Sequence, residues 1–318
     1  MTIKRPILKS FIAITFAALV ITGCKKEEEP EPTPAPVATD GTTEQSQRAS
    51  DQSNSDNESN TAMDEANTAM QDVSTTRDFQ ACGMIIDSSQ KAIGKITLNY
   101  NGNDCSGTRS RSGSIIIKLP YDSTTSTITR WSDPGCKAEL TFVNYKVTYL
   151  ANNKSLKFNG THSITNVYGG YFLQRLLASQ PIVYKVRADM QISYDDGTSR
   201  IWKAAKSRTY SQVAGVVKTT VEGDTIVNGH NDVAAWGTTR MGDSFTLDVP
   251  TPIAYYIYGS TCLYKPTGMV VLYVATKSLS ITYGVDIAGT IVTGGCPYGY
   301  KLNWTDIQGT PQQYVVAY

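Results

Sequence analysis

A change of composition near residue 79 constrains the fold of this chain more than any other feature. From there to the C-terminus, short runs rich in β-branched and aromatic residues recur, and residues that favour turns separate them. Apolar and polar residues alternate in several runs, which would place Ile96, Leu98 and Tyr100 on one face of a strand. The pattern predicts an all-β domain over residues 79–318, in which repeated antiparallel hairpins form one large sandwich or two smaller ones.

Turn signals that contain glycine set the positions of the expected hairpins. The clearest hairpin has two alternating runs around the Asp-Asp-Gly segment at 195–197. The Asn-Gly pairs at 101–102 and 159–160 predict two further turns. Residues 171–180 are the one good helix candidate in this region. A division into two sub-domains is possible near 210–215. That stretch has no strong linker character, so one extended domain is an equal alternative.

Cys24 ends a segment that resembles the signal peptide of a bacterial lipoprotein. Lys4, Arg5 and Lys9 supply positive charge, and a short apolar run and small residues then precede the cysteine. In such lipoboxes the thiol takes a diacylglycerol and the chain is cleaved before it. We expect residues 1–23 to be removed and acyl chains such as palmitate to hold Cys24 in a membrane. The apolar run is too short to span a bilayer, which needs about 20 apolar residues.

Residues 24–78 should form a disordered tether between this anchor and the β domain. The stretch 41–62 has almost no large apolar side chain, so it has little to offset the entropy of ordering. The tether carries a net charge of −9, whereas the domain after it carries +7. One short, marginal helix is expected from residue 61 to 73, with Met63, Ala66 and Met70 near one face.

Five cysteines remain besides Cys24, and an extracytoplasmic location permits disulfides. Proximity in the sequence predicts a Cys82–Cys105 pair and a Cys262–Cys296 pair, which leaves Cys136 free. The chain has no C-x-x-C spacing and only two histidines, so we expect no metal site and no cofactor. Its basic residues do not cluster, and no nucleic-acid partner is expected.

Several short motifs resemble a group of uncharacterised Bacteroidota lipoproteins with repeated β-hairpins. They are the NDCSG, RSRSG and III segments between 103 and 117, the run at 142–147, the hairpin at 196–197 and the turn at 262–268. The basic-then-acidic cluster Lys25–Glu29 resembles the export signal of surface lipoproteins in that phylum. The resemblance implies an outer-membrane lipoprotein at the cell surface and supplies no catalytic residue. A plain charged linker and a domain that faces the periplasm are the alternative.

Three kinds of segment carry side chains that could bind a metal ion or take part in catalysis. The same residue types are also typical of turns. The loop at 101–107 has oxygen ligands for calcium, but it lacks the EF-hand pattern and fits an Asx-turn. His230 lies near Asp232 and could be a general base, yet no nucleophile motif accompanies it. Paired carboxylates for glycoside hydrolysis could come from aspartates that mostly neighbour glycine. These are Asp195, Asp196, Asp224, Asp243 and Asp248.

Tyrosine and tryptophan supply the best binding candidates, since the chain has 19 Tyr and 4 Trp against 7 Phe. Tyr298, Tyr300 and Trp304 alternate and could form a stacking platform for sugars. Three further tyrosines form a second cluster at 255–258. The alternative interpretation is structural: pairs of side chains on neighbouring strands of a sheet use the same residue types.

The sequence as a whole favours a non-enzymatic binding or adhesion module, attached to a membrane through Cys24, for a glycan or protein ligand. An envelope hydrolase that uses acidic turn residues is one alternative. A structural accessory subunit of an envelope complex is another.

Overall fold

Hairpin follows hairpin along this chain, so nearly every strand pairs with its neighbours in sequence. The computed structural model describes residues 42–71, 82–213, 215–306 and 308–318. Fourteen of its strands form one antiparallel sheet, which confirms the all-β, antiparallel fold class. Among the described residues the only other sheet has two strands, so the hairpins join into one large sheet and no second large sheet faces it.

The order of strands across the sheet is β1-β2-β3-β6-β7-β8-β9-β10-β12-β13-β14-β15-β16, and β11 pairs with both β9 and β12. The separate β4 (Tyr121–Asp122) and β5 (Thr127–Ile128) pair with each other, near the 3-10 turn η2 (Lys91–Ile93). The sheet strands are β1 (Met84–Asp87), β2 (Lys95–Asn103), β3 (Arg109–Lys118), β6 (Cys136–Tyr149), β7 (Lys154–Asn166), β8 (Ile182–Tyr194), β9 (Ser199–Val213), β10 (Val216–Gly223), β11 (Val233–Thr238), β12 (Ser244–Tyr258), β13 (Thr267–Val274), β14 (Lys277–Val285), β15 (Gly299–Thr305) and β16 (Pro311–Ala317).

Local sequence signals located some connections correctly and others wrongly. The turn at 195–197 joins β8 to β9, and α2 (Phe172–Leu177) lies within the predicted helix, so both predictions are confirmed. The Asn-Gly pairs at 101–102 and 159–160 were expected to be turns but lie inside β2 and β7. Gly160 has a φ of +137°, and a Cβ there would lie 2.2 Å from the backbone oxygen of Asp189. This glycine therefore permits close approach of the neighbouring strand and does not reverse the chain.

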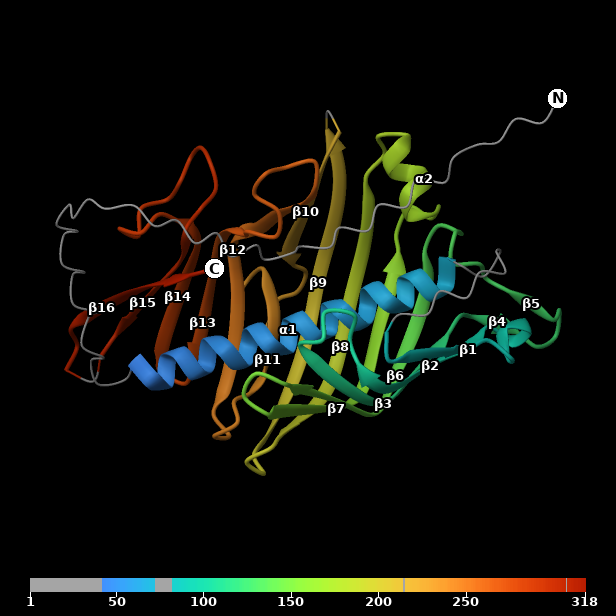
Figure 1. Ribbon diagram of the computed structural model, residues 1–318, viewed down its shortest axis with the longest axis horizontal. Coiled ribbons are helices and arrows are strands. Elements are labelled where there is room, and N and C mark those ends of the chain that lie inside the picture. Colours follow the sequence, from blue (N-terminus) through green and yellow to red (C-terminus); the bar gives the residue numbers. More distant parts are fainter. Residues whose placement is uncertain (1–41, 72–81, 214, 307) are drawn as a thin grey trace, which may run out of the picture. The chain divides into compact units, whose positions relative to one another are not determined.

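The largest departure from the sequence prediction is α1 (Thr42–Gln71), a 30-residue helix where a disordered tether with one short helix at 61–73 was expected. Figure 1 shows α1 lying across one face of the sheet, while the first strands curve forward below it. Met63, Ala66 and Met70 are buried against the sheet, as their spacing predicted. Ser55 and Glu58 are buried on the helix as well. The prediction of disorder was wrong because polar side chains of α1 find partners on the strands.

The core lies between α1 and the face of the sheet that it covers. Ile96, Leu98 and Tyr100 are all buried there, as the alternation in β2 predicted. The described residues belong to one compact unit, and β9 and β10 pair without interruption from Val213 with Val216 to Lys206 with Gly223.

Both predicted disulfides, Cys82–Cys105 and Cys262–Cys296, are formed, and Cys136 is free and buried. Residues 1–23 and Cys24, the predicted signal peptide and anchor, lie outside the described residues. Within the described ranges, no helix combines the length and apolar character that crossing a bilayer requires.

Candidate functional site: a cleft between a helix and the sheet

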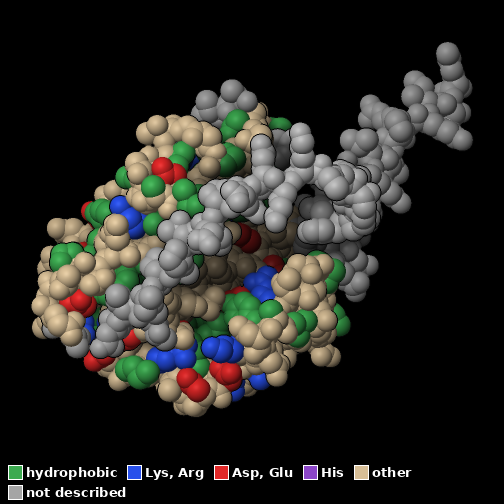
Figure 2. Space-filling view, turned by 60° about the vertical axis from the view of Figure 1, so that its left-hand side comes forward, with side chains coloured by type: hydrophobic (Ala, Val, Ile, Leu, Met, Phe, Trp, Pro, Cys, Tyr) green, Lys and Arg blue, Asp and Glu red, His purple; other side chains and the backbone are tan. Residues whose placement is uncertain are grey.

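The helix α1 is held by ion pairs to a basic face of the sheet. It contains six acidic residues and one basic residue, and every pair below joins one of its carboxylates to a cation on or beside the strands. Figure 2 shows this face hollowed, with acidic and basic side chains beside the hollow. The pairs are Asp51–Arg240, Asp56–Lys206, Glu58–Arg109, Asp64–Arg208 and Glu65–Arg111.

The spacing of these carboxylates places them on two neighbouring faces of α1. Asp51, Glu58 and Glu65 recur every seven residues, so they share one face. Glu58 and Glu65 meet β3, where the carboxylate oxygens lie 2.7 and 2.6 Å from guanidinium nitrogens. Asp56 and Asp64 lie on the adjacent face and meet β9. Strands on both sides thus fix the rotation of the helix about its axis.

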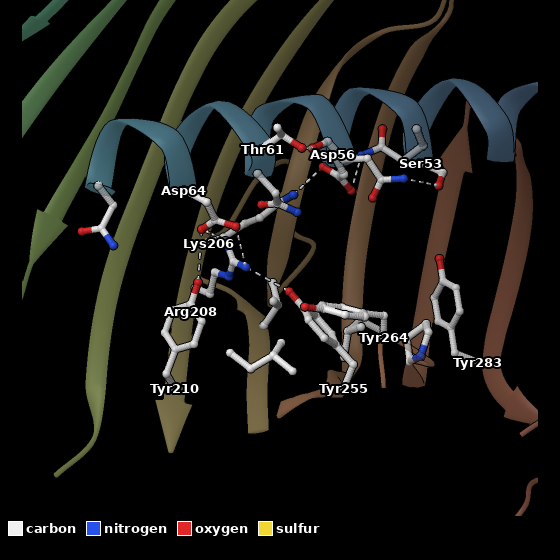
Figure 3. Close-up of a pocket in the computed structure, with 18 of the residues that line it drawn as sticks. Ser53, Asp56, Thr61, Asp64, Lys206, Arg208, Tyr210, Tyr255, Tyr264 and Tyr283 are labelled. Atoms are coloured by element: carbon white, nitrogen blue, oxygen red, sulfur yellow. Dashed lines mark hydrogen bonds and ion pairs between the residues drawn. The ribbon is translucent and has the colours of Figure 1, made fainter. Parts of the chain in front are cut away.

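A cleft of about 820 Å³ lies between α1 and strands β9 to β14. Figure 3 shows tyrosines of the strands, and Tyr264 from the connection between β12 and β13, below the helix, with polar helix residues above them. The volume falls within the ~300–1,000 Å³ of typical ligand sites. The floor is aliphatic and aromatic and includes Leu247, Ile253, Tyr255, Val270, Ile281 and Tyr283.

The wall that α1 presents to the cleft consists of hydroxyl, amide and carboxylate groups. Most of their hydrogen bonds stay within the helix: Asn57 Nδ2 donates to Ser53 Oγ at 3.4 Å, and Thr61 Oγ1 donates to the Asn57 carbonyl at 2.9 Å. The side-chain amide of Asn60, which also lines the cleft, has no hydrogen-bond partner among the described residues. A ligand with hydroxyl groups would find free donors and acceptors along this wall.

Arg208 connects the two sides of the cleft. Its Nη1 donates to Asp64 Oδ1 at 3.0 Å and its Nη2 donates to Tyr255 Oη at 3.1 Å. The guanidinium also lies over the ring of Tyr210, 4.9 Å from the ring centre. Burial raises the pKa of Tyr210, so this phenol remains neutral.

The aromatic residues singled out in the sequence are only partly brought together. Trp304 is 6% exposed and belongs to the core, and the half-buried ring of Tyr300 lies 5.8 Å from that of Tyr283. Tyr298, at 44% exposed, is the one exposed ring of the three, so they form no shared exposed platform. From the second cluster, Tyr255 lines the cleft. Tyr255 contributes to the cleft only together with Arg208 and α1, and neither of these lies near Tyr255 in the sequence.

The acidic candidates have separate partners, and none of the five aspartates considered for hydrolysis is among the described residues that line the cleft. Asp224 pairs with Lys185 and Arg187, and Asp196 pairs with Arg240. The other three, Asp195, Asp243 and Asp248, likewise lie outside the lining, and Asp248 Oδ2 is 2.9 Å from His230 Nδ1.

His230 was considered as a general base beside Asp232, with a hairpin tip as the favoured interpretation; its ring pairs with Asp248 on β12 and lies 4.4 Å from the ring of Tyr273. In the 101–107 loop, Asp104 accepts hydrogen bonds from Ser106, Thr108 and Arg109. Burial alone would raise the pKa of Asp104, but these bonds outweigh it and lower the pKa to about 2. The loop is therefore an Asx-type turn, whose carboxylate is already fully engaged.

No group of three or more His, Cys, Asp or Glu among the described residues is arranged to hold a metal ion. No protein-family model, curated protein or solved structure matches this chain.

Proposed function

We propose that this protein is a lipid-anchored, extracytoplasmic binding module whose ligand is a glycan seated in the cleft between α1 and strands β9 to β14. One observation carries the proposal: tyrosine and aliphatic side chains form the floor of the cleft, and amide and hydroxyl groups form its wall.

This division of chemistry suits a sugar ring, which has apolar C–H faces and a polar rim. Tyr255, Tyr264 and Tyr283 offer flat rings with polar ends, the property that makes tyrosine effective in binding sites. Asn57, Asn60 and neighbouring residues of α1 can exchange hydrogen bonds with hydroxyl groups. An apolar ligand such as an alkane would leave this wall without partners, which costs free energy.

The location completes the proposal. Cys24 with its lipobox supports attachment to the outer membrane, and the Lys25–Glu29 cluster supports exposure at the cell surface. Protease treatment of intact cells, followed by an antibody against the β domain, tests this. We expect loss of the signal from intact cells, with a periplasmic control protein protected. Protection of the domain until lysis would contradict surface exposure.

Binding of the protein to an array of oligosaccharides, followed by titration calorimetry on the positive members, tests the ligand class. Tyr264 is 68% exposed, so Tyr264→Ala should leave the unfolding midpoint unchanged. We expect it to weaken binding about tenfold, equivalent to ~1.4 kcal/mol. The matched control is Tyr298→Ala, which removes an exposed tyrosine outside the cleft and should bind like the native protein. Equal affinities for both variants would contradict the assignment of the site.

A further inference from the structure

We infer that the glycan bound in the cleft is acidic, and that Lys206 and Arg208 take its carboxylate, sulfate or phosphate group. This inference rests on the proposed glycan function and narrows it to one chemical class. Its basis is a difference in how the two sides of the cleft hold their charges.

The cations are fixed by the sheet. Lys206 and Arg208 lie two residues apart on β9, on the same face, and their side chains are 9% and 6% exposed. The guanidinium of Arg208 is held by Tyr255 and Tyr210 as described above, and Lys206 Nζ lies 5.4 Å from the ring centre of Trp202. Both cations therefore have partners on the strands that would remain after a carboxylate left.

The anions paired with them come from the helix and are more accessible. The Asp64 side chain is 54% exposed, although its partner Arg208 is buried, and the side chain of Asp56 is 24% exposed. Because the Asp64 carboxylate is largely in contact with solvent, water can hydrate it once a ligand anion takes its place beside Arg208. A ligand anion that reaches Arg208 would therefore replace Asp64 at low cost.

Arg208 also has unused hydrogen-bonding capacity. Its Nε is buried and has no partner among the described residues, whereas both Nη atoms are bonded. Guanidinium groups bind carboxylate and phosphate through two parallel N–H donors. An anion that used Nε together with one Nη would satisfy this donor, which the pairing with Asp64 leaves unmet.

Two interpretations of Asp64 give opposite predictions for its substitution. If Asp64 competes with an acidic glycan for Arg208, then Asp64→Asn removes the competitor and strengthens binding. If Asp64 accepts hydrogen bonds from hydroxyl groups of a neutral sugar, the same change weakens binding.

The test measures the affinity of the full chain, in detergent, for matched pairs of oligosaccharides by calorimetry. Each pair contains an acidic probe and its neutral counterpart: tetragalacturonate with its methyl ester, a sulfated tetrasaccharide with its desulfated form, and a phosphorylated one with its dephosphorylated form. We expect at least one acidic member to bind about tenfold more tightly than its neutral partner. Asp64→Asn should strengthen that acidic binding about fivefold and change neutral binding less than twofold.

The matched control is Asp189→Asn, which removes the same charge from an exposed pair with Lys203, away from the cleft. It should leave both affinities unchanged. A second variant, Arg208→Lys, keeps the charge but loses the paired donors, and should abolish the preference for the acidic member.

Equal or tighter binding of the neutral members, or weaker binding to both members in Asp64→Asn, would overturn the acidic class and leave the glycan proposal standing. Binding of no member of any pair would overturn both proposals.

Discussion

His162 is a titratable side chain that is only 2% exposed, on the face beneath α1. It lies on β7 in register with Ala188 on β8, and neither of its ring nitrogens has a hydrogen-bond partner among the described residues. Burial lowers the pKa of His162 to about 3, and the nearby charge of Lys206 acts in the same direction. The folded protein therefore keeps this imidazole neutral under conditions in which an unfolded chain would protonate it.

This difference predicts that stability falls as the pH is lowered. Between the ordinary pKa of 6.5 and the folded value of about 3, the unfolded state binds a proton that the folded state excludes. The free energy of unfolding should thus decrease by ~1.4 kcal/mol per pH unit across that window because of His162 alone. Replacement by leucine (His162→Leu) should remove this part of the slope in urea unfolding curves measured from pH 7 to 4. Parallel profiles for the two proteins would show that His162 is accessible to protons when folded.

At the scale of an element, α1 depends on contacts between residues that are far apart in the sequence. Alternation in β2 and the paired cysteines are local signals, and they predicted a strand and two disulfides correctly. The helix has Ser, Asn, Asp and Thr at most positions, which are weak helix formers. It is ordered by Arg111, Arg208 and other cations that lie 46 to 189 residues further along the chain. No window of the sequence contains both halves of these pairs, so only a short helix at 61–73 was predictable, and neither the full length of α1 nor the cleft beside it was.

The ion pairs predict that a single buried carboxylate controls the order of α1. Glu58 is 1% exposed and accepts hydrogen bonds from Arg109 at 2.7 Å and Tyr149 at 3.1 Å. Removing one member of a buried pair costs ~3–5 kcal/mol, and Arg109 keeps Asp104, so we expect Glu58→Ala to cost about 1–3 kcal/mol. Amide hydrogen exchange measures this loss. Exchange should become faster along α1, while β7 and β8 remain protected.

The neighbouring variant Asn57→Ala is the control for this experiment, because Asn57 is exposed and bonds only within the helix. The amide hydrogens of α1 in this variant should exchange at the same rate as in the native protein. Equal exchange in Glu58→Ala and Asn57→Ala would show that α1 is held by its apolar contacts alone.

For the whole molecule, the two disulfides lie in different parts of the strand order: Cys82–Cys105 lies at the edge formed by β1, and Cys262–Cys296 lies two strands in from the edge formed by β16. Cys82–Cys105 closes 23 residues around β1 and β2, and Cys262–Cys296 closes 34 residues around β13 and β14. The strands between them are held only by the sheet and α1. One crosslink thus restrains a free edge of the sheet, where a strand has a neighbour on one side only, whereas β15 and β16 lie beyond the other crosslink.

Loop-closure entropy predicts that each crosslink stabilises the fold by ~3–4 kcal/mol relative to the reduced chain. Replacing Cys262 and Cys296 by alanine together should lower the free energy of unfolding by that amount. Chemical unfolding in the absence of reductant measures it, and Cys136→Ala serves as a control for loss of a cysteine outside a disulfide. An unchanged midpoint in the double variant would contradict the prediction.

The long sequence separation between α1 and its partners also determines a folding order. During synthesis the helix emerges before every strand that will hold it, and Arg240 follows Asp51 by 189 residues. A helix with these residues has little stability on its own. The segment that becomes α1 therefore reaches its full set of ion-pair partners only when the chain has been made at least as far as the turn between β11 and β12. Because α1 is one wall of the cleft and strands up to β14 supply the rest, a partly synthesised chain lacks the complete cleft, and the ligand site that we propose belongs to the completed protein.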